Sequence, residues 1–376
     1  MSAGATDVVI VGAGIVGAAT ALECARAGLS VRVVDAGPIG GGATAAGMGH
    51  VVVMDDSEAQ FALTHYSRRL WQELAEELPE DCEYHQFGTI WVAADEEEME
   101  EVYRKQRFYE ARGVRVEVLD GPQLYEAEPH LRAGLRGGLL VVEDSVVYPP
   151  CVARFLLERA AELGATASEG VAVREMTGQG VRPADGEWVS AGLTINAAGS
   201  WSPELTPGLA VHKRKGHLAI TDRYPGFVRH QLVELGYLKS AHSISTDSVA
   251  FNAQPRVTGQ ILIGSSRQYG VDDGAVEQRM LKWMLERAIE YMPELARLSV
   301  IRTWTGFRAA TPDKLPLIGK GAGEGALWLA TGHEGLGITT SLGTAKLLVD
   351  QLVGRASAIP FDPYLPTRSM EEAHHG

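Results

Sequence analysis

The segment from Val8 to Gly17 constrains the fold of this chain more than any other feature. It joins a short apolar strand to the glycines of a GxGxxG pattern at Gly12, Gly14 and Gly17, and a good helix follows that ends at Gly28. In such a unit the first glycine makes a tight turn, the second lets a pyrophosphate approach the backbone, and the third lets helix and strand pack closely. The pattern predicts a dinucleotide-binding βαβ unit.

The second strand of this unit adds a polar group. It ends at Asp35, eighteen residues after Gly17. A carboxylate there is placed to accept a hydrogen bond from a ribose hydroxyl. The phosphates would lie at the helix N-terminus, where free N–H groups and the helix dipole favour an anion. A purely structural glycine-rich turn is the alternative, and the flanking strand and helix favour the nucleotide.

Composition limits the remaining classes of protein. The 376 residues exceed one typical domain and are 45% hydrophobic, so we expect two domains that share segments. The net charge is −14, with scattered basic residues, which argues against a nucleic-acid partner. Three widely spaced cysteines predict no disulfide framework and no metal site. Without a signal peptide or a membrane-spanning stretch, we expect a cytoplasmic protein that would reach a membrane only through a partner.

Hydrophobic periodicity predicts alternating helices and strands along the rest of the chain. A stretch with glycines and prolines, residues 135–150, is expected to be a connection. Helices are expected at about residues 57–78, 151–163, 276–291 and 338–353, and strands at 84–93, 114–119, 193–199 and 257–264.

Several segments taken together resemble the D-amino acid oxidase-like (DAO) family of FAD-dependent oxidoreductases over nearly the whole chain. They are the opening GxGxxG with Asp35, GGGATAAGMG at 40–49, NAAGSW at 196–201, GFRAATPDKLP at 306–316, and GHEGLGIT at 332–339. Within the family, KRKGHL at 213–218, QPR at 254–256 and LIGSSR at 262–267 look most like the flavin (beta) subunits of D-hydroxyproline and opine dehydrogenases. Glycine oxidases and hydrogen cyanide synthase flavoproteins are also similar.

The resemblance implies an α/β fold with two domains. A Rossmann-like FAD-binding domain would comprise residues 1–82, 146–209 and 302–364. An α+β substrate domain with a mostly antiparallel sheet would comprise residues 83–145 and 210–301, and residues 365–376 would form a tail.

The resemblance also implies the residues that hold FAD. The final helix would point its N-terminus at the flavin pyrimidine edge, where N–H groups stabilise the negative charge of the reduced flavin. No residue demands a covalent link. The expected FAD-binding residues are Gly12, Gly14, Gly17, Asp35, Ala36, Gly42, Ala43, Thr44, Gly47, Met48, Ala198, Gly199, Gly335, Leu336, Gly337, Ile338 and Thr339.

The implied reaction is oxidation of a small amino or imino acid at its α-carbon, with hydride transfer to flavin N5 and D-hydroxyproline or a D-proline-like compound as substrate. Arg308 is the expected carboxylate ligand, because its planar fork binds both oxygens. An ion pair is its alternative role, and Ala309 follows where relatives usually have proline. His50 and Met48 would line the substrate site, with His50 orienting an amine or acting as a weak base unless it is structural. Tyr237 would place a hydroxyl over the carboxylate.

The electron acceptor distinguishes the remaining hypotheses. Residues 259–270 contain no lysine of the kind that sarcosine oxidases place over the flavin, which favours a dehydrogenase that passes electrons to a partner subunit or a quinone. A glycine, sarcosine or D-amino acid oxidase that produces peroxide is the first alternative, and a flavin-carrying electron-transfer subunit is the second. A nicotinamide-linked dehydrogenase would leave the 40–49 loop without a role. Both a homo-oligomer and a hetero-oligomer are compatible with the sequence.

Overall fold

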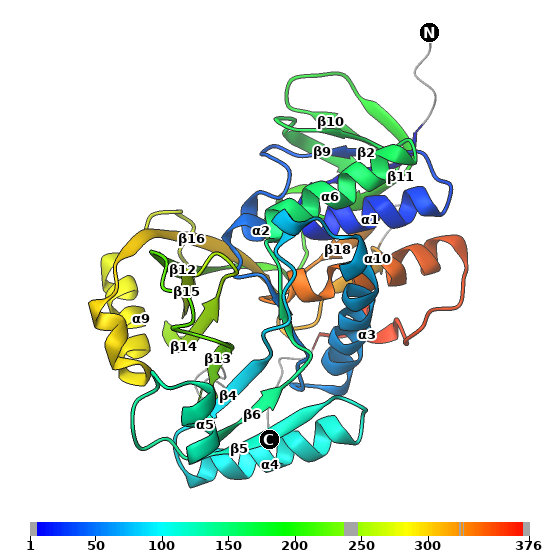
Figure 1. Ribbon diagram of the computed structural model, residues 1–376. Helices are drawn as coiled ribbons and strands as arrows, with labels where there is room; N and C mark the ends of the chain where they lie inside the picture. Colours follow the sequence, from blue (N-terminus) through cyan, green and yellow to red (C-terminus); the bar gives the residue numbers. More distant parts are fainter. Residues whose placement is uncertain (1–5, 237–246, 323–324, 326, 371–376) are drawn as a thin grey trace. The chain divides into compact units, whose positions relative to one another are not determined.

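The computed structural model describes residues 6–236, 247–322, 325 and 327–370 (Figure 1). The chain forms two compact units. The first unit comprises Met1–Cys82, Val147–Lys213 and Phe307–Gly376, and the second comprises Glu83–Val146 and Arg214–Gly306. The sequence analysis places the boundaries between the two domains after residues 82, 145, 209 and 301, and ends the first domain at residue 364. The two units of the structure change over after residues 82, 146, 213 and 306.

The first unit is built on a sheet of mainly parallel strands. Its order is β17-β18-β11-β1-β2-β8, with β9 and β10 attached to β11. Both neighbours of β1 run parallel to it, and β17 joins antiparallel. The strands are β1 Thr6–Val11, β2 Val31–Val34, β8 Thr166–Ser168, β9 Val173–Thr177, β10 Gly180–Pro183, β11 Val189–Asn196, β17 Leu317–Lys320 and β18 Leu327–Thr331. This central parallel sheet confirms the predicted α/β fold class.

Two layers bury the central strand β1. Helix α1 packs against α6 and α10, and α3 packs against α10. On the other face, Val9 and Val11 of β1 contact Met176 and Val181 of the β9–β10 hairpin. A parallel strand that is covered on both faces must be apolar throughout, which explains the run VVIV. The helices are α1 Ile15–Arg26, α2 Gly42–Ala46, α3 Glu58–Leu74, α6 Pro149–Glu162, α7 Ser202–Leu205 and α10 Gly337–Val353, and a short strand β3 covers His50–Val51.

The second unit is built on a mostly antiparallel sheet, as predicted. Its order is β16-β12-β15-β14-β13-β4-β6-β5. Strands β13 and β4 pair in parallel, whereas β4–β6, β5–β6, β13–β14, β14–β15 and β12–β15 pair antiparallel. The strands of this sheet are β4 Thr89–Ala93, β5 Val116–Asp120, β6 Gly137–Val141, β12 His212–Thr221, β13 Gln231–Glu234, β14 Ser248–Pro255, β15 Ile261–Arg267 and β16 Val300–Ala310. The short strand β7 Ser145–Val146 lies outside this sheet. The helices are α4 Glu96–Glu110, α5 Gly121–Ala127 and α9 Gln278–Tyr291.

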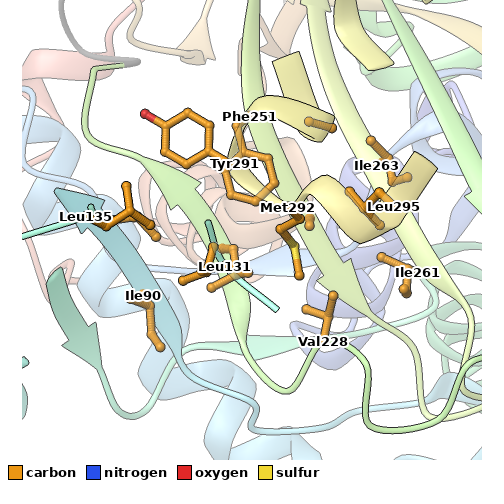
Figure 2. Packing of buried hydrophobic residues seen from close by; sticks show 14 of the residues in the cluster. Ile90, Leu131, Leu135, Val228, Phe251, Ile261, Ile263, Tyr291, Met292 and Leu295 are labelled. Carbon is orange, nitrogen blue, oxygen red and sulfur yellow. The ribbon is translucent and has the colours of Figure 1, made fainter. Parts of the chain in front are cut away.

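A core between α9 and the sheet stabilises this unit (Figure 2). Phe251 of β14 and Tyr291 of α9 stack with ring centroids 4.7 Å apart and planes inclined by 6°. Met292 and Leu295 continue this apolar layer just after the helix. Offset aromatic pairs of this kind add to the free energy gained by burial. The core therefore fixes α9 on β14 and β15.

Strand β6 corrects the sequence analysis, which predicts residues 135–150 as a connection. Gly137 and Gly138 begin a strand that pairs with both β4 and β5. A Cβ added at Gly137 would lie 2.2 Å from the carbonyl oxygen of Leu119, and one added at Gly138 would lie 2.7 Å from the carbonyl oxygen of Trp91. The glycines permit a close approach of neighbouring backbones, although in sequence they resemble turn residues.

The segment expected to form a tail, residues 365–376, is anchored through Arg368. The Arg368 guanidinium donates to both carboxylate oxygens of Asp313 at 2.7 and 2.9 Å and to the backbone carbonyls of Leu315, Pro316 and Leu365. A partly buried bidentate pair of this kind holds the chain in place through Arg368. Within the described ranges, no helix combines the length and hydropathy needed to cross a membrane.

Candidate cofactor and substrate site

The first glycine turn, at the carboxyl end of β1, admits no side chain at two positions. Gly12 has φ +112°, and a Cβ there would lie 2.4 Å from the Ala197 carbonyl oxygen. A Cβ at Gly17 would lie 1.9 Å from the carbonyl oxygen of Gly12. Both contacts are with backbone, which cannot rotate away. The glycines therefore close the turn and hold α1 directly against β1 and the end of β11.

Asp35 lies immediately after β2 and holds the neighbouring turns with both carboxylate oxygens. Oδ2 accepts a hydrogen bond from the Ala13 N–H at 2.6 Å, and Oδ1 accepts one from the Gly37 N–H at 2.7 Å. The residue is half-buried, and Ala36 beside it is exposed. A carboxylate has about four lone-pair sites, so each oxygen retains capacity for a ribose hydroxyl.

The glycine-rich loop folds over the first turn of α1. The Gly40 N–H donates to the Ala13 carbonyl at 2.9 Å, and the Thr44 hydroxyl accepts from the Ile15 N–H at 3.0 Å. A Cβ at Gly14 would lie 3.1 Å from the Thr44 hydroxyl oxygen. Because the Thr44 hydroxyl is the acceptor in its bond with Ile15, its own proton can still be donated to a bound anion. Helix α2, which contains Gly42 and Ala43, thereby lies beside the turn that is predicted to bind phosphate.

The segment after β11 adjoins the same turn. The Ala198 nitrogen would be 3.1 Å from a Cβ at Gly12, and its N–H donates to the Asn196 side chain at 3.1 Å. Gly199 has φ +55°, and its carbonyl accepts from the Thr331 hydroxyl at 2.9 Å. Side-chain hydrogen bonds therefore hold this turn in place.

Helix α10 begins close to α1. A Cβ at Gly337 would lie 3.9 Å from Val16 of α1. The first helical hydrogen bond of α10 runs from the Thr340 N–H to the Leu336 carbonyl. The N–H groups of residues 337–339 belong to the first turn and have no acceptor within the helix. The Leu336 N–H differs from expectation, because it donates to the His333 carbonyl at 2.9 Å. Gly337, Ile338 and Thr339 therefore supply the helix N-terminus.

Thr339 fastens this N-terminus to the loop after residue 47. Its hydroxyl donates to the His50 carbonyl at 2.9 Å and accepts from the Val52 N–H at 3.3 Å. Its own carbonyl accepts from the Trp71 indole at 2.9 Å. The side chain is fully buried, so only its backbone N–H is suited to a cofactor. One residue earlier, the Cδ1 methyl of Ile338 lies 2.6 Å from the position a Cβ would take at Gly47, so the two segments pack closely there.

His333 supports the turn from inside. Its Nε2 lies 3.0 Å from the Thr344 hydroxyl of α10. Burial lowers the pKa of His333 to about 3, because the charged ring would lose its hydration. The ring is therefore neutral at physiological pH and acts as a structural support.

Arg308 of β16 lies beside the turn that leads into α10. An ideal Cβ at Gly335 would lie 3.6 Å from the Arg308 Nε and 3.7 Å from its Cδ. The Glu334 N–H donates to the Ala309 carbonyl at 2.8 Å, which joins the turn to the strand next to this arginine. A guanidinium therefore lies within a few ångströms of the predicted flavin-contacting turn.

The structure describes two of the three other predicted substrate-site residues. Met48 is 7% exposed and His50 is half-buried, and both belong to the loop that Thr339 fastens. Tyr237 lies outside the described residues. The sequence analysis did not name Trp71 or Trp201 among the expected site residues. Trp201 lies 3.5 Å from a Cβ placed at Gly42 and makes an edge contact with Phe307, and its position in the NAAGSW segment was the available signal.

The donor set fits a dinucleotide with a pyrophosphate. Glycines leave the backbone accessible at the turn after β1, the N-termini of α1 and α10 lie close together, and a carboxylate follows β2. Helix N-termini bind anions, and a carboxylate at the end of the second strand binds ribose. These features converge within the first unit.

Comparisons with known proteins agree with this geometry. The model of the FAD dependent oxidoreductase family (DAO) matches residues 7–351. Glycine oxidase of Pseudomonas aeruginosa is 30% identical over 376 residues, covering 96% of this chain and 98% of that protein. The hydrogen cyanide synthase subunit HcnC of P. aeruginosa is 29% identical, covering 97% of each chain. The crystal structure of glycine oxidase from Geobacillus kaustophilus has a TM-score of 0.87 at 27% identity, covering 97% of this chain and 99% of that one.

Proposed function

Because this chain belongs to the DAO family of FAD-dependent oxidoreductases, we propose that it oxidises the bond between the α-carbon and nitrogen of a small amino or imino acid. The glycine turn after β1, the Thr44 hydroxyl and Asp35 would hold the pyrophosphate and ribose of FAD. When bound, FAD supplies the electron acceptor, with N5 taking a hydride. The N-terminus of α10 would stabilise negative charge beside it.

The position of Arg308 carries the proposal of an amino acid substrate. Its Nε is 3.6 Å from the Cβ position of Gly335, in the turn that leads to the N-terminus of α10. A planar guanidinium binds both oxygens of a carboxylate and thereby fixes the orientation of the α-carbon. Holding the reacting C–H bond in one orientation is itself a large part of catalysis.

Further roles follow for the loop beside this turn. Met48 and His50 would border the substrate, and the His50 ring would orient the amine or accept its proton.

We further propose a cyclic substrate, D-hydroxyproline or a D-proline-like compound, and an acceptor other than oxygen. The absence of lysine from residues 259–270 supports the dehydrogenase. A partner subunit is supported by HcnC, which is itself named as a subunit. A quinone is the alternative acceptor, and a cytoplasmic protein would then reach a membrane through its partner.

A glycine, sarcosine or D-amino acid oxidase is the second candidate. The similarity to glycine oxidases over nearly the full length of both chains favours it. Such an enzyme would deliver electrons to oxygen and release peroxide. The two candidates share the cofactor and the carboxylate ligand and differ in substrate size and acceptor.

Anaerobic bleaching of the flavin spectrum tests the proposal. The purified holoenzyme is mixed with D-hydroxyproline, D-proline, L-proline, sarcosine, glycine or D-alanine, and peroxide is assayed in air for each. Bleaching without peroxide supports the dehydrogenase, whereas bleaching with peroxide supports the oxidase. Arg308→Lys keeps the charge but loses the planar fork, so we expect a KM at least roughly ten-fold higher. A flavin that no compound bleaches would overturn the proposal and favour an electron-transfer subunit.

A further inference from the structure

Gly335 lacks a side chain at a position where the backbone does not require glycine. Its φ is outside the left-handed region, and a Cβ would make only ordinary contacts of 3.6 and 3.7 Å with Arg308. Gly332, in the same turn, is different: its φ is +77°, and a Cβ would lie 2.7 Å from the Thr311 methyl. Steric need therefore explains Gly332 but not Gly335.

The turn holds Gly335 at a fixed distance from Arg308. On one side, the Glu334 N–H donates to the Ala309 carbonyl at 2.8 Å. On the other side, the Leu336 N–H donates to the His333 carbonyl at 2.9 Å. These two bonds fix the backbone on either side of Gly335, and thereby the position that a Cβ would take beside the guanidinium.

The residue is also exposed, so packing does not explain its small size. A larger residue would extend from a point 3.6 Å from the Arg308 Nε and cover that edge of the guanidinium. A carboxylate bound to the fork brings its α-carbon substituent into the same neighbourhood. The space beside Arg308 is therefore a space for substrate.

We propose that Gly335 determines substrate size, leaving room beside Arg308 for an α-carbon that carries a ring or another substituent. This inference rests on the proposed function, because it takes Arg308 as the carboxylate ligand. It favours cyclic imino acids over glycine as the substrate class.

The test compares Gly335→Ala and Gly335→Val with the parent holoenzyme. Binding of acetate and of 2-furoate, a carboxylate on a five-membered ring, is followed by the change in flavin absorbance, which needs no turnover. Because a misplaced methyl group changes discrimination by roughly ten-fold or more, we expect Gly335→Val to weaken furoate at least roughly ten-fold more than acetate. Gly335→Ala should show the same preference to a smaller degree. The kcat/KM ratio of D-proline to glycine should fall in parallel.

Equal weakening of acetate and furoate, or no weakening of either at full flavin content, would overturn the inference. Failure of the proposed function is separable. If the parent enzyme oxidises no compound of the panel but Gly335→Val still discriminates between the two carboxylates, the size filter stands and the assigned reaction fails. If the parent bleaches with D-proline and Gly335→Val treats both carboxylates alike, the reaction stands and the size filter fails.

Discussion

The Thr339 hydroxyl donates a hydrogen bond of 2.9 Å to the carbonyl of His50, joining residues 289 positions apart in the sequence. The same hydroxyl accepts from Val52, and the Thr339 carbonyl accepts from Trp71. The N-terminus of α10 and the loop that contains Met48 are thereby held as one piece. Two segments predicted to border the flavin therefore depend on one buried threonine.

Thr339→Val should loosen this connection. Valine has nearly the same shape but leaves the Val52 N–H and the His50 carbonyl without this partner, at a cost of about 1–3 kcal/mol of unfolding free energy. The affinity for FAD should fall together with the unfolding free energy. It is measured from the fluorescence of the FAD that is released when the holoenzyme is diluted. Thr339→Ser keeps the hydroxyl and is the matched control. If serine and valine give the same loss, the hydrogen bonds are not responsible.

Gly12→Ala and Gly28→Ala separate steric clash from backbone strain. Both glycines have positive φ, +112° and +83°, and only a Cβ at Gly12 meets an atom within 4 Å, the Ala197 carbonyl oxygen at 2.4 Å. Left-handed backbone costs roughly 1–2 kcal/mol for alanine, so Gly28→Ala should lose about that much stability and keep its flavin. Gly12→Ala should lose more and purify with little FAD. Comparable flavin content in the two variants would contradict the assigned turn.

Asp35→Asn should weaken FAD binding, because an amide can offer an acceptor to only one of the two N–H groups that the carboxylate now binds. We expect a Kd at least roughly ten-fold higher, since hydrogen bonds to a charged group contribute about 1.5–3 kcal/mol. Asp7→Asn is the control. Asp7 makes comparable bonds to Ser30 at the other end of the β1–β2 pair, so its loss should leave the Kd unchanged. A shared loss of affinity would show general destabilisation instead.

His333 should make the protein sensitive to acid. Its folded pKa of about 3 lies below the ordinary 6.5, so between these values the unfolded chain binds a proton that the folded chain does not. Unfolding free energy then falls as pH drops below about 6.5, by at most about 1.4 kcal/mol per pH unit, until the folded pKa is passed. His333→Asn removes this contribution, which denaturant titrations between pH 4 and 7 would measure. The exposed His212 provides a control, and an unchanged slope in His333→Asn would refute the prediction.

Helix α10 illustrates how well local patterns predict. The expected helix at 338–353 is observed as Gly337–Val353. Hydrophobic periodicity predicts the helix, and Gly354, with φ +69°, predicts where it ends. Both are local signals that do not depend on distant segments. Strand β6 shows the opposite case. Its two glycines resemble a turn, and their real role depends on carbonyl oxygens of Trp91 and Leu119, which no local pattern reveals.

The sequence alone determined the βαβ unit, because strand, glycine turn and helix are local patterns and a Cβ at Gly17 would meet the Gly12 carbonyl oxygen five residues earlier. Family resemblance extended this to the cofactor and to Arg308 as a candidate ligand. The contact that requires glycine at position 12 is with Ala197 and came only with the tertiary structure. Only the tertiary structure decided that Gly335 lies beside that arginine, that the Leu336 N–H is turned to His333, and that Thr339 serves the fold through its hydroxyl. These contacts join distant segments, and their distances depend on how helices pack on sheets, which no spacing along the chain encodes.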